Sequence, residues 1–419
     1  MENKGNGFAL QYERLKRFKR GKLRIAVAID AVMRLVFKIG RAVFPNRSSS
    51  APIAVAPNKI LVLQAGGAGD VVMSLPALNA IRARFPKAII TLVAGPWASE
   101  LLKETRLVQR VLGVRPPWLG RFSLSNWTQF LRHALRLRKE DFDVGIDLQG
   151  DPRSLLFLYL SGAERRVSYA WYGASMGEYL LTQVVPGPAP DDHLIDRFLA
   201  VATSLGSQVR SRVPQLHLSD AERVTALTWR RSLQTKGTRL LVGVHPGAGN
   251  PLRLWRSERF AELVRQMGQT FDADVVVFAG PGEEARAAEI IQRAGTGTLL
   301  SGLTLRDLII KISALDGLVA LDSSAAHLGA ALEVPVVCLF GPTLSRFGGP
   351  IGPTVRSLQE GQFECRPCTQ ERCVHPDASC MDTITVELVL KAASVVAKGA
   401  RPGSVAPSLL QIGTKDGSV

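Results

Sequence analysis

Short apolar runs alternate with stretches of helical periodicity over most of this chain. Runs at 60–64, 89–93 and 144–148 are predicted strands, and a glycine-rich turn at 65–70 leads from the first run into a helix over 71–85. Strands that alternate with helices are typical of parallel βαβ units. The pattern therefore predicts a doubly wound parallel sheet in the first half of the chain.

The same alternation begins again near residue 238. Apolar runs at 240–245, 274–279, 317–321 and 334–340 predict four more strands, and residues between them have helical spacing. A second doubly wound sheet is expected. In such sheets ligands bind at the carboxyl ends of the strands, and two sheets that face each other create a cleft.

These elements predict an α/β protein with two facing Rossmann-like domains and a cleft between them. The expected order is a basic arm and linker (1–56), a first Rossmann-like domain (57–218), a connector (219–237), a second Rossmann-like domain (238–395) and a disordered tail (396–419).

Charge is concentrated at the start of the chain. Residues 1–50 hold twelve Lys and Arg against three Asp and Glu, which is +9 of the formal net charge of +16. Charged residues interrupt the apolar segment at 23–38, so neither a membrane span nor a signal peptide is expected. The arm is predicted either to lie on an anionic inner membrane surface as an amphipathic helix or to be a solvated extension. It has no recognisable reader motif, so nucleic acid is not an expected partner.

A polar turn follows the predicted strand at 317–321. Asp322, Ser323 and Ser324 stand where a helix needs its N-cap, so backbone N–H groups and the positive end of the helix dipole point into the turn. This pattern predicts an anion site with His327 in the first helical turn. The alternative is an ordinary strand-to-helix connection with a core histidine.

The glycine-rich turn at 65–70 ends in Asp70. It is not a dinucleotide fingerprint, because Val72 occupies the position of the third glycine. A carboxylate on a turn at the edge of a cleft can act as a general base towards a hydroxyl. The alternative is an aspartate that caps the helix.

Four of the five cysteines fall within one short polar segment. Cys365, Cys368, Cys373 and Cys380 suggest a structural metal site such as zinc, with reduced thiols or disulfides as the alternative. Cys338 lies in a predicted buried strand and is expected to be a core residue. No catalytic role is assigned to any of them.

Five motifs occur in an order that resembles glycosyltransferase family 9, the ADP-heptose:lipopolysaccharide heptosyltransferases. The resemblance covers most of residues 59–395 and rests on the segments at 66–78, 245–255, 280–284, 322–327 and 340–343. It implies a GT-B fold, an inverting mechanism without a metal or other catalytic cofactor, and an ADP-activated sugar as donor.

The resemblance also implies roles for single residues. Asp70 matches the catalytic base, and Arg253 falls where the family usually has a lysine near the donor's phosphates and sugar. Arginine keeps the charge but replaces a point donor with a planar fork. Arg256 stands where the family usually has proline, which is a second departure.

The remaining matched positions correspond to residues that face the donor in the family. The resemblance implies contacts to the phosphates from Ala248 and Gly249, to the ribose from Glu283, to the base from Leu303, to the sugar from Asp322, and to the diphosphate from Ser323, Ser324, Ala325 and His327.

An acceptor groove is expected near Trp171 and Tyr172, with Tyr169 and the pair Arg165 and Arg166 beside them; ordinary packing is the alternative. The function expected from the resemblance is transfer of a heptose-type sugar from an ADP-sugar to a lipopolysaccharide core or lipid A acceptor by a cytoplasmic, peripheral membrane enzyme. The alternatives are a related transferase with another nucleotide sugar or glycan acceptor, and a non-catalytic nucleotide- or nucleic-acid-binding protein.

Overall fold

A computed structural model describes residues 34–35, 56–118, 123–169, 177–186, 192–233, 240–368 and 372–399. The described chain divides into two compact units between Arg212 and Val213. Nearly all of the predicted basic arm, and the tail from residue 400, lie outside the described residues.

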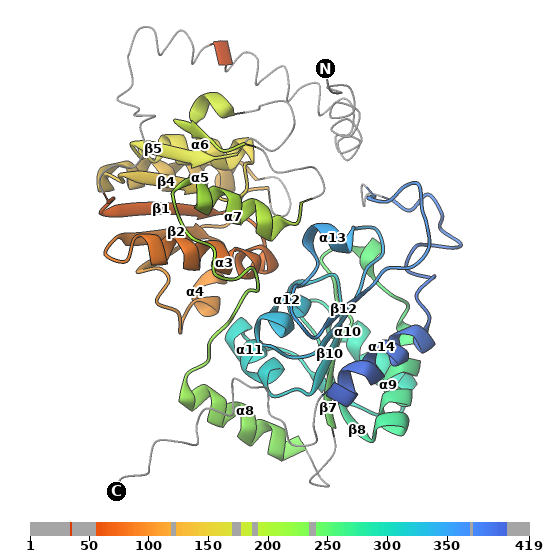
Figure 1. Ribbon diagram of the computed structural model, residues 1–419. Helices are drawn as coiled ribbons and strands as arrows, with labels where there is room; N and C mark the ends of the chain where they lie inside the picture. The colour runs from red at the N-terminus through yellow and green to blue at the C-terminus, as the bar shows by residue number, and fades with distance from the viewer. Residues whose placement is uncertain are drawn as a thin grey trace, which may run out of the picture. The chain divides into compact units, whose positions relative to one another are not determined.

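The first unit contains a six-stranded parallel sheet with strand order β3-β2-β1-β4-β5-β6 (Figure 1). Its elements are, in chain order, β1 (Lys59–Gln64), α3 (Ala68–Arg84), β2 (Ile89–Ala94), α4 (Ala98–Leu101), β3 (Arg110–Gly113), α5 (Leu124–Leu137), β4 (Val144–Asp147), α6 (Pro152–Leu160), β5 (Arg165–Ser168), β6 (Gln183–Val184) and α7 (Leu194–Ser204).

Helices cover both faces of this sheet. Leu61 and Leu63 of β1 pack in one apolar cluster with Phe130 and Ala134 of α5 and Leu155 of α6. Helices α3 and α7 pack against each other. Strand β1, with all but its first residue buried, therefore forms the centre of this core.

The second unit repeats the arrangement, with strand order β12-β11-β10-β7-β8-β9 and parallel pairing throughout. Its elements are α8 (Asp220–Leu233), β7 (Leu240–His245), α9 (Ser257–Phe271), β8 (Ala273–Phe278), α10 (Glu284–Ala294), β9 (Thr298–Leu300), α11 (Leu305–Ser313), β10 (Gly317–Leu321), α12 (Ser324–Ala331), β11 (Val336–Leu339), α13 (Ser345–Gly348), β12 (Val355–Leu358) and α14 (Val386–Gly399).

Helix α8 belongs to this second unit. Two buried or nearly buried ion pairs attach it, from Arg230 to Asp316 at 2.6 Å and from Arg306 to Glu222 at 2.5 Å. The hydrogen bonds from Arg306 lower the pKa of Glu222 to about 2. The segment predicted as a connector, 219–237, is thus largely a packed helix, while the predicted domain limits stay predictions.

The predicted α/β class is confirmed by these two sheets. Each predicted apolar run forms a strand close to its expected limits, and the helix predicted over 71–85 begins three residues earlier, at Ala68. Among the described residues, no helix is long and apolar enough to cross a membrane.

Candidate functional site

The strand order places one switch point in each sheet. In the first unit the chain runs from β1 through β2 to β3 at one edge of the sheet and then returns to β4. The neighbouring strands β1 and β4 are therefore followed by connections that lead to opposite edges of the sheet. In the second unit β7 and β10 have the same relation. Ligands of doubly wound sheets bind at the carboxyl ends of such a strand pair. The predicted base follows β1, and the main predicted donor residues follow β7 and β10.

Asp70 lies in the first turn of α3 rather than at its N-cap. Its Oδ2 accepts a hydrogen bond of 2.7 Å from the backbone N–H of Gly67, which is the N-cap residue. The helix N-terminus is therefore occupied by a carboxylate of the chain itself. This geometry holds the Asp70 side chain in one orientation at the carboxyl end of β1.

The loop after β4 also reaches this carboxylate. A Cβ atom added to Gly66 would lie 2.4 Å from Asp70 Oδ2 and 2.4 Å from Gln149 Nε2. These two atoms are therefore neighbours, and only glycine at position 66 leaves room for both. The sequence did not single out Gln149, which lies 79 positions after Asp70 and approaches it through the pairing of β1 with β4.

Asp147, the last residue of β4, is fully buried beside this loop. Its Oδ2 accepts hydrogen bonds from the Gly150 N–H at 2.6 Å and the Ser168 hydroxyl at 3.2 Å. Its Oδ1 is buried and has no hydrogen-bond partner among the described residues. Burial raises the pKa of Asp147 to about 7, against the effect of these hydrogen bonds. The carboxyl group is thus largely neutral below that pH.

In the second unit the structure brings Arg253 and Asp322 together. Arg253 Nη1 lies 3.1 Å from Asp322 Oδ2, and the Thr343 hydroxyl donates a hydrogen bond of 2.5 Å to the same oxygen. The three residues follow β7, β10 and β11, which are adjacent strands. A cation, a carboxylate and a hydroxyl from three separate motifs therefore form one polar group at the switch point.

Helix α12 begins directly beside this group. Ser323 is its N-cap residue, but its side chain makes no capping hydrogen bond, and its Oγ is buried with no partner among the described residues. Ser324 is half-buried, whereas Ala325 and His327 are buried in the first turns. The turn thus has the geometry of a helix N-terminus that receives an anion.

Glu283 and His245 form a second polar group on the other side of β7. His245 Nε2 lies 3.8 Å from Glu283 Oε2, and that oxygen accepts a hydrogen bond of 2.9 Å from the Gly280 N–H. Burial lowers the pKa of His245 although Glu283 opposes this shift. A Cβ on Gly247 would fall 1.9 Å from the Glu283 carboxylate, so this carboxylate lies directly over the loop.

The other predicted donor residues are accessible to different degrees. Ala248 and Leu303 are half-buried and Gly249 is exposed. Contacts of all these residues with a donor stay predictions.

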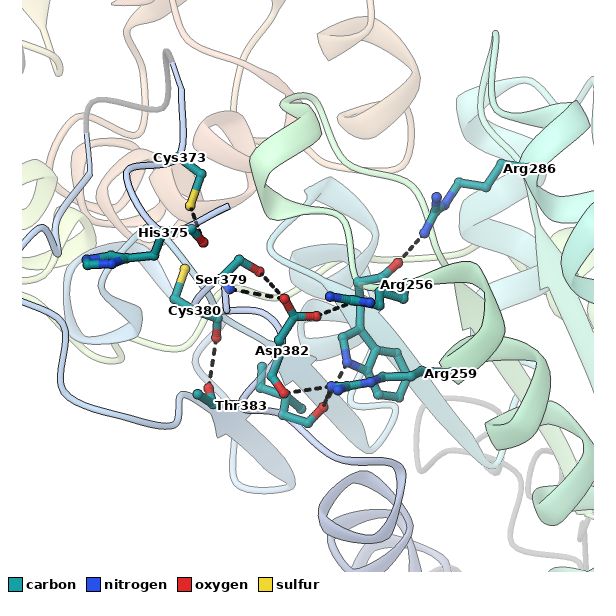
Figure 2. A network of polar contacts seen from close by, with 11 residues as sticks. Arg256, Arg259, Arg286, Cys373, His375, Ser379, Cys380, Asp382 and Thr383 are labelled. Atoms are coloured by element: carbon teal, nitrogen blue, oxygen red, sulfur yellow. Dashed lines mark hydrogen bonds and ion pairs between the residues drawn. The ribbon is translucent and has the colours of Figure 1, made fainter. Parts of the chain in front are cut away.

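The residues just after Arg253 form hydrogen bonds and an ion pair with the segment that follows the four cysteines (Figure 2). Trp255 is fully buried and donates a hydrogen bond of 2.9 Å from Nε1 to the Ile384 carbonyl. Arg256 forms an ion pair of 2.5 Å with Asp382, and Arg259 donates to the Asp382 carbonyl at 2.8 Å. Arginine in place of the family's proline at position 256 is therefore matched by a carboxylate on the neighbouring segment.

The four clustered cysteines are free thiols in this structure. Within the described ranges, no group of three or more His, Cys, Asp or Glu side chains is arranged to hold a metal ion. The Cys373 thiol faces the His375 carbonyl at 3.3 Å, and burial raises the pKa of Cys380. A structural metal at these cysteines stays a prediction, and none of the chemistry below depends on it.

The predicted acceptor groove is described only in part, because Trp171 and Tyr172 lie outside the described residues. Tyr169 is buried and donates to the Leu148 carbonyl at 3.1 Å. Arg166 is buried and donates to the Leu180 carbonyl at 2.7 Å. These two side chains are engaged in internal packing, which was the alternative interpretation of this region.

Comparison with known proteins gives the same family as the motifs. Residues 130–378, more than half of the chain, match the sequence model described as glycosyltransferase family 9 (heptosyltransferase). The lipopolysaccharide heptosyltransferase 2 of Salmonella typhimurium is 27% identical over 316 residues, which are 72% of this chain and 88% of the relative.

Two solved structures have the same fold. The Escherichia coli ADP-heptose lps heptosyltransferase II superposes with a TM-score of 0.65 at 24% identity, over 81% of this chain and 99% of that one. The E. coli heptosyltransferase WaaC with ADP gives a TM-score of 0.61 at 20% identity, over 81% and 100%. The chain belongs to glycosyltransferase family 9, and its activity is the transfer of a glycosyl group.

Proposed function

We propose that this protein transfers a heptose-type sugar from an ADP-sugar to a hydroxyl of a lipopolysaccharide core acceptor. The names of its relatives support the sugar and the acceptor, and a structural neighbour solved with ADP supports the nucleotide. The observation that carries the proposal is the group formed by Arg253, Asp322 and Thr343 beside the N-terminus of α12. This group offers both charge and hydrogen bonds to an activated sugar.

The donor's leaving group is a nucleoside diphosphate. In the proposed reaction the bond between the anomeric carbon and the phosphate oxygen breaks, and negative charge develops on that oxygen. Arg253, His327 and the backbone amides at the start of α12 are the groups assigned to stabilise this charge, so the reaction needs no metal. Asp322 orients Arg253 through their ion pair.

The acceptor is activated in the first unit. Asp70 takes the proton of the acceptor hydroxyl as its oxygen attacks the anomeric carbon from the side opposite the leaving group, so the configuration inverts. The Gly67 N–H positions the Asp70 carboxylate, and the Gln149 amide lies near it.

Two neighbouring glycines offer a matched test of the base. In Gly66→Ala the new methyl group would displace the Asp70 and Gln149 side chains, whereas in Gly67→Ala it would lie 3.6 Å from Asp70, an ordinary contact. Release of ADP from ADP-heptose with a core acceptor should fall about 100-fold or more in Gly66→Ala and in Asp70→Asn. It should fall much less in Gly67→Ala, and a chelator should have no effect. Equal activity of Gly66→Ala and Gly67→Ala would contradict the role of Asp70.

A related transferase with another nucleotide sugar or glycan acceptor is the second candidate. It is favoured by Arg253 in place of lysine and by the absence of side-chain hydroxyls at Ala248 and Gly249. Calorimetric titration with ADP, UDP, GDP and CMP distinguishes the two. Tight binding of ADP alone, lost in Asp322→Ala, supports the first proposal. Preference for another nucleotide would leave the fold and the base unchanged and replace the donor.

We also propose that the enzyme works in the cytoplasm, at the inner face of the membrane, where its acceptor would be presented. The basic arm predicted to attach it there lies outside the described residues.

A further inference from the structure

Helix α5 of the first unit exposes two leucines on its outer side. Leu124 keeps 72% and Leu135 51% of its surface accessible, while Phe130 and Ala134 of the same helix are buried in the core. With Leu131, which is half-buried, the leucines follow the spacing i, i+7, i+11, so they lie in one line along the helix. Leu131 packs against the core cluster, whereas Leu124 and Leu135 are not part of it. The exposure of these two leucines is not explained by packing within the unit.

Cations flank this line. Arg132, Arg136, Arg138 and Lys139 are all exposed, and α5 itself contains no Asp or Glu. The nearest acidic residue along the chain, Glu140, is already paired with Arg110 at 2.8 Å. Asp141, which follows Glu140, is also exposed, but the cations still outnumber the acidic residues here. The outer face of α5 and the turn after it thus combine exposed leucines with an excess of positive charge.

We propose that this face of α5 is a docking surface for an anionic lipid bilayer. Leucines enter the boundary between headgroups and acyl chains while the arginines and the lysine contact lipid phosphates, which is the arrangement of interfacial amphipathic helices. A nucleic acid would match the cations but would give the leucines no apolar partner. The proposal concerns a surface of this unit and does not rest on the donor, the acceptor or the basic arm.

The magnitude follows from the number of groups involved. A cation near an anionic membrane surface contributes about a fivefold gain in binding, so removal of two cations should weaken it about 25-fold. Withdrawal of two leucine side chains from the interface should weaken it about tenfold or more. Both changes lie at exposed positions and should leave the folded state intact.

The test is cosedimentation of the full-length protein with vesicles, without any sugar substrate. Vesicles of phosphatidylcholine mixed with phosphatidylglycerol are compared with vesicles of phosphatidylcholine alone. Leu124→Ser/Leu135→Ser and Arg132→Ser/Arg136→Ser should each lose binding to the anionic vesicles by the factors above. The thermal unfolding of both variants should match that of the parent.

Two double variants elsewhere serve as matched controls. Val209→Ser/Val224→Ser removes apolar side chains that are 43% and 55% exposed, and Arg210→Ser/Arg231→Ser removes two exposed cations. Both should bind vesicles nearly as the parent does. If the α5 variants bind like the parent, or if the controls lose as much, the proposal is wrong and membrane contact, where present, is made elsewhere or by charge alone. Arginine-dependent vesicle binding that ignores the leucines would also overturn it, because the contact would then be electrostatic and would not involve insertion of the leucines.

Because the assay contains no substrate, its failure leaves the proposed function standing. Conversely, an enzyme that uses another donor would still show vesicle binding through α5. Transfer to a soluble, delipidated acceptor should be equal in the parent and the α5 variants.

Discussion

Substitution of Asp147 by asparagine should change how stability depends on pH. In the folded chain the pKa of this carboxyl is raised from 3.8 to about 7 by burial. Between these values the folded state keeps a proton that the unfolded state has lost. Stability therefore falls as pH rises through this window, and the loss is complete above the folded pKa. An asparagine side chain has no proton to lose there, so the variant should lack this dependence.

The pKa difference sets the size of the effect. About three pKa units correspond to about 4 kcal/mol of unfolding free energy. This is an upper limit, because ionisation of Asp147 would draw water or a rearranged donor towards Oδ1, which has no partner among the described residues. Part of this total is already lost at pH 5, because that pH lies above the unfolded pKa of 3.8. The cost of Asp147→Asn should thus be smaller at about pH 8 than at about pH 5, by as much as roughly 2.5 kcal/mol.

Urea unfolding followed by tryptophan fluorescence at both pH values measures this difference. Trp118 and Trp127 lie near each other in the first unit, with ring centroids 6.0 Å apart, and report on its core. Asp316→Asn is the control for loss of a buried aspartate, since it leaves Arg230 without its carboxylate and should destabilise the second unit. An Asp147→Asn variant that loses the same free energy at both pH values would show that the buried carboxyl is ionised and would refute the reasoning.

Three further changes test the second unit. Gly247→Ala should weaken nucleotide binding about tenfold or more, as measured by calorimetry, because its methyl group would displace the Glu283 carboxylate. The control is Gly268→Ala, whose methyl group would make only an ordinary contact at 3.7 Å, and this variant should bind nucleotide like the parent. Arg253→Lys, which keeps the charge, should retain transfer activity within about tenfold in an ADP-release assay, whereas Arg253→Ala should lose about 100-fold or more of it. Equal losses of activity in the two variants would mean that the planar guanidinium group is needed and not only the positive charge. Trp255→Phe should lower the free energy of unfolding by about 1–3 kcal/mol in a urea titration, because it removes a buried hydrogen bond and leaves a gap; an unchanged midpoint would show that the anchor is dispensable.

The central strands could be predicted from the sequence because they are buried on both faces. Strands such as β1 and β10 are nearly continuous apolar runs, which is the pattern of a central parallel strand. The edge strands β3 and β12 contain Arg110 and Arg356 and have few buried residues. Their strand geometry comes from pairing with a neighbour rather than from their own composition, so the hydrophobic pattern did not reveal them.

The candidate site was predictable where a motif follows its own strand. Asp70, Arg253 and Asp322 each stand just after an apolar run, and a parallel sheet collects such positions at one edge. Asp147 ends β4 and Gln149 follows it, but their relation to the turn that carries Asp70 depends on the pairing of β1 with β4. That pairing joins Leu63 to Asp147 across 84 positions, and no local pattern encodes it.

The two units show how one topology yields two different sites. In the first, the carboxylate of Asp70 turns back to the helix N-terminus and accepts the Gly67 N–H, so that turn presents a negative group of its own. In the second, the carboxylate of Asp322 turns away from α12 towards Arg253 and Thr343, and the N-cap Ser323 makes no capping hydrogen bond. A helix N-terminus without its own capping carboxylate attracts an external anion. The direction of one aspartate side chain therefore separates a turn suited to a base from a turn suited to a diphosphate.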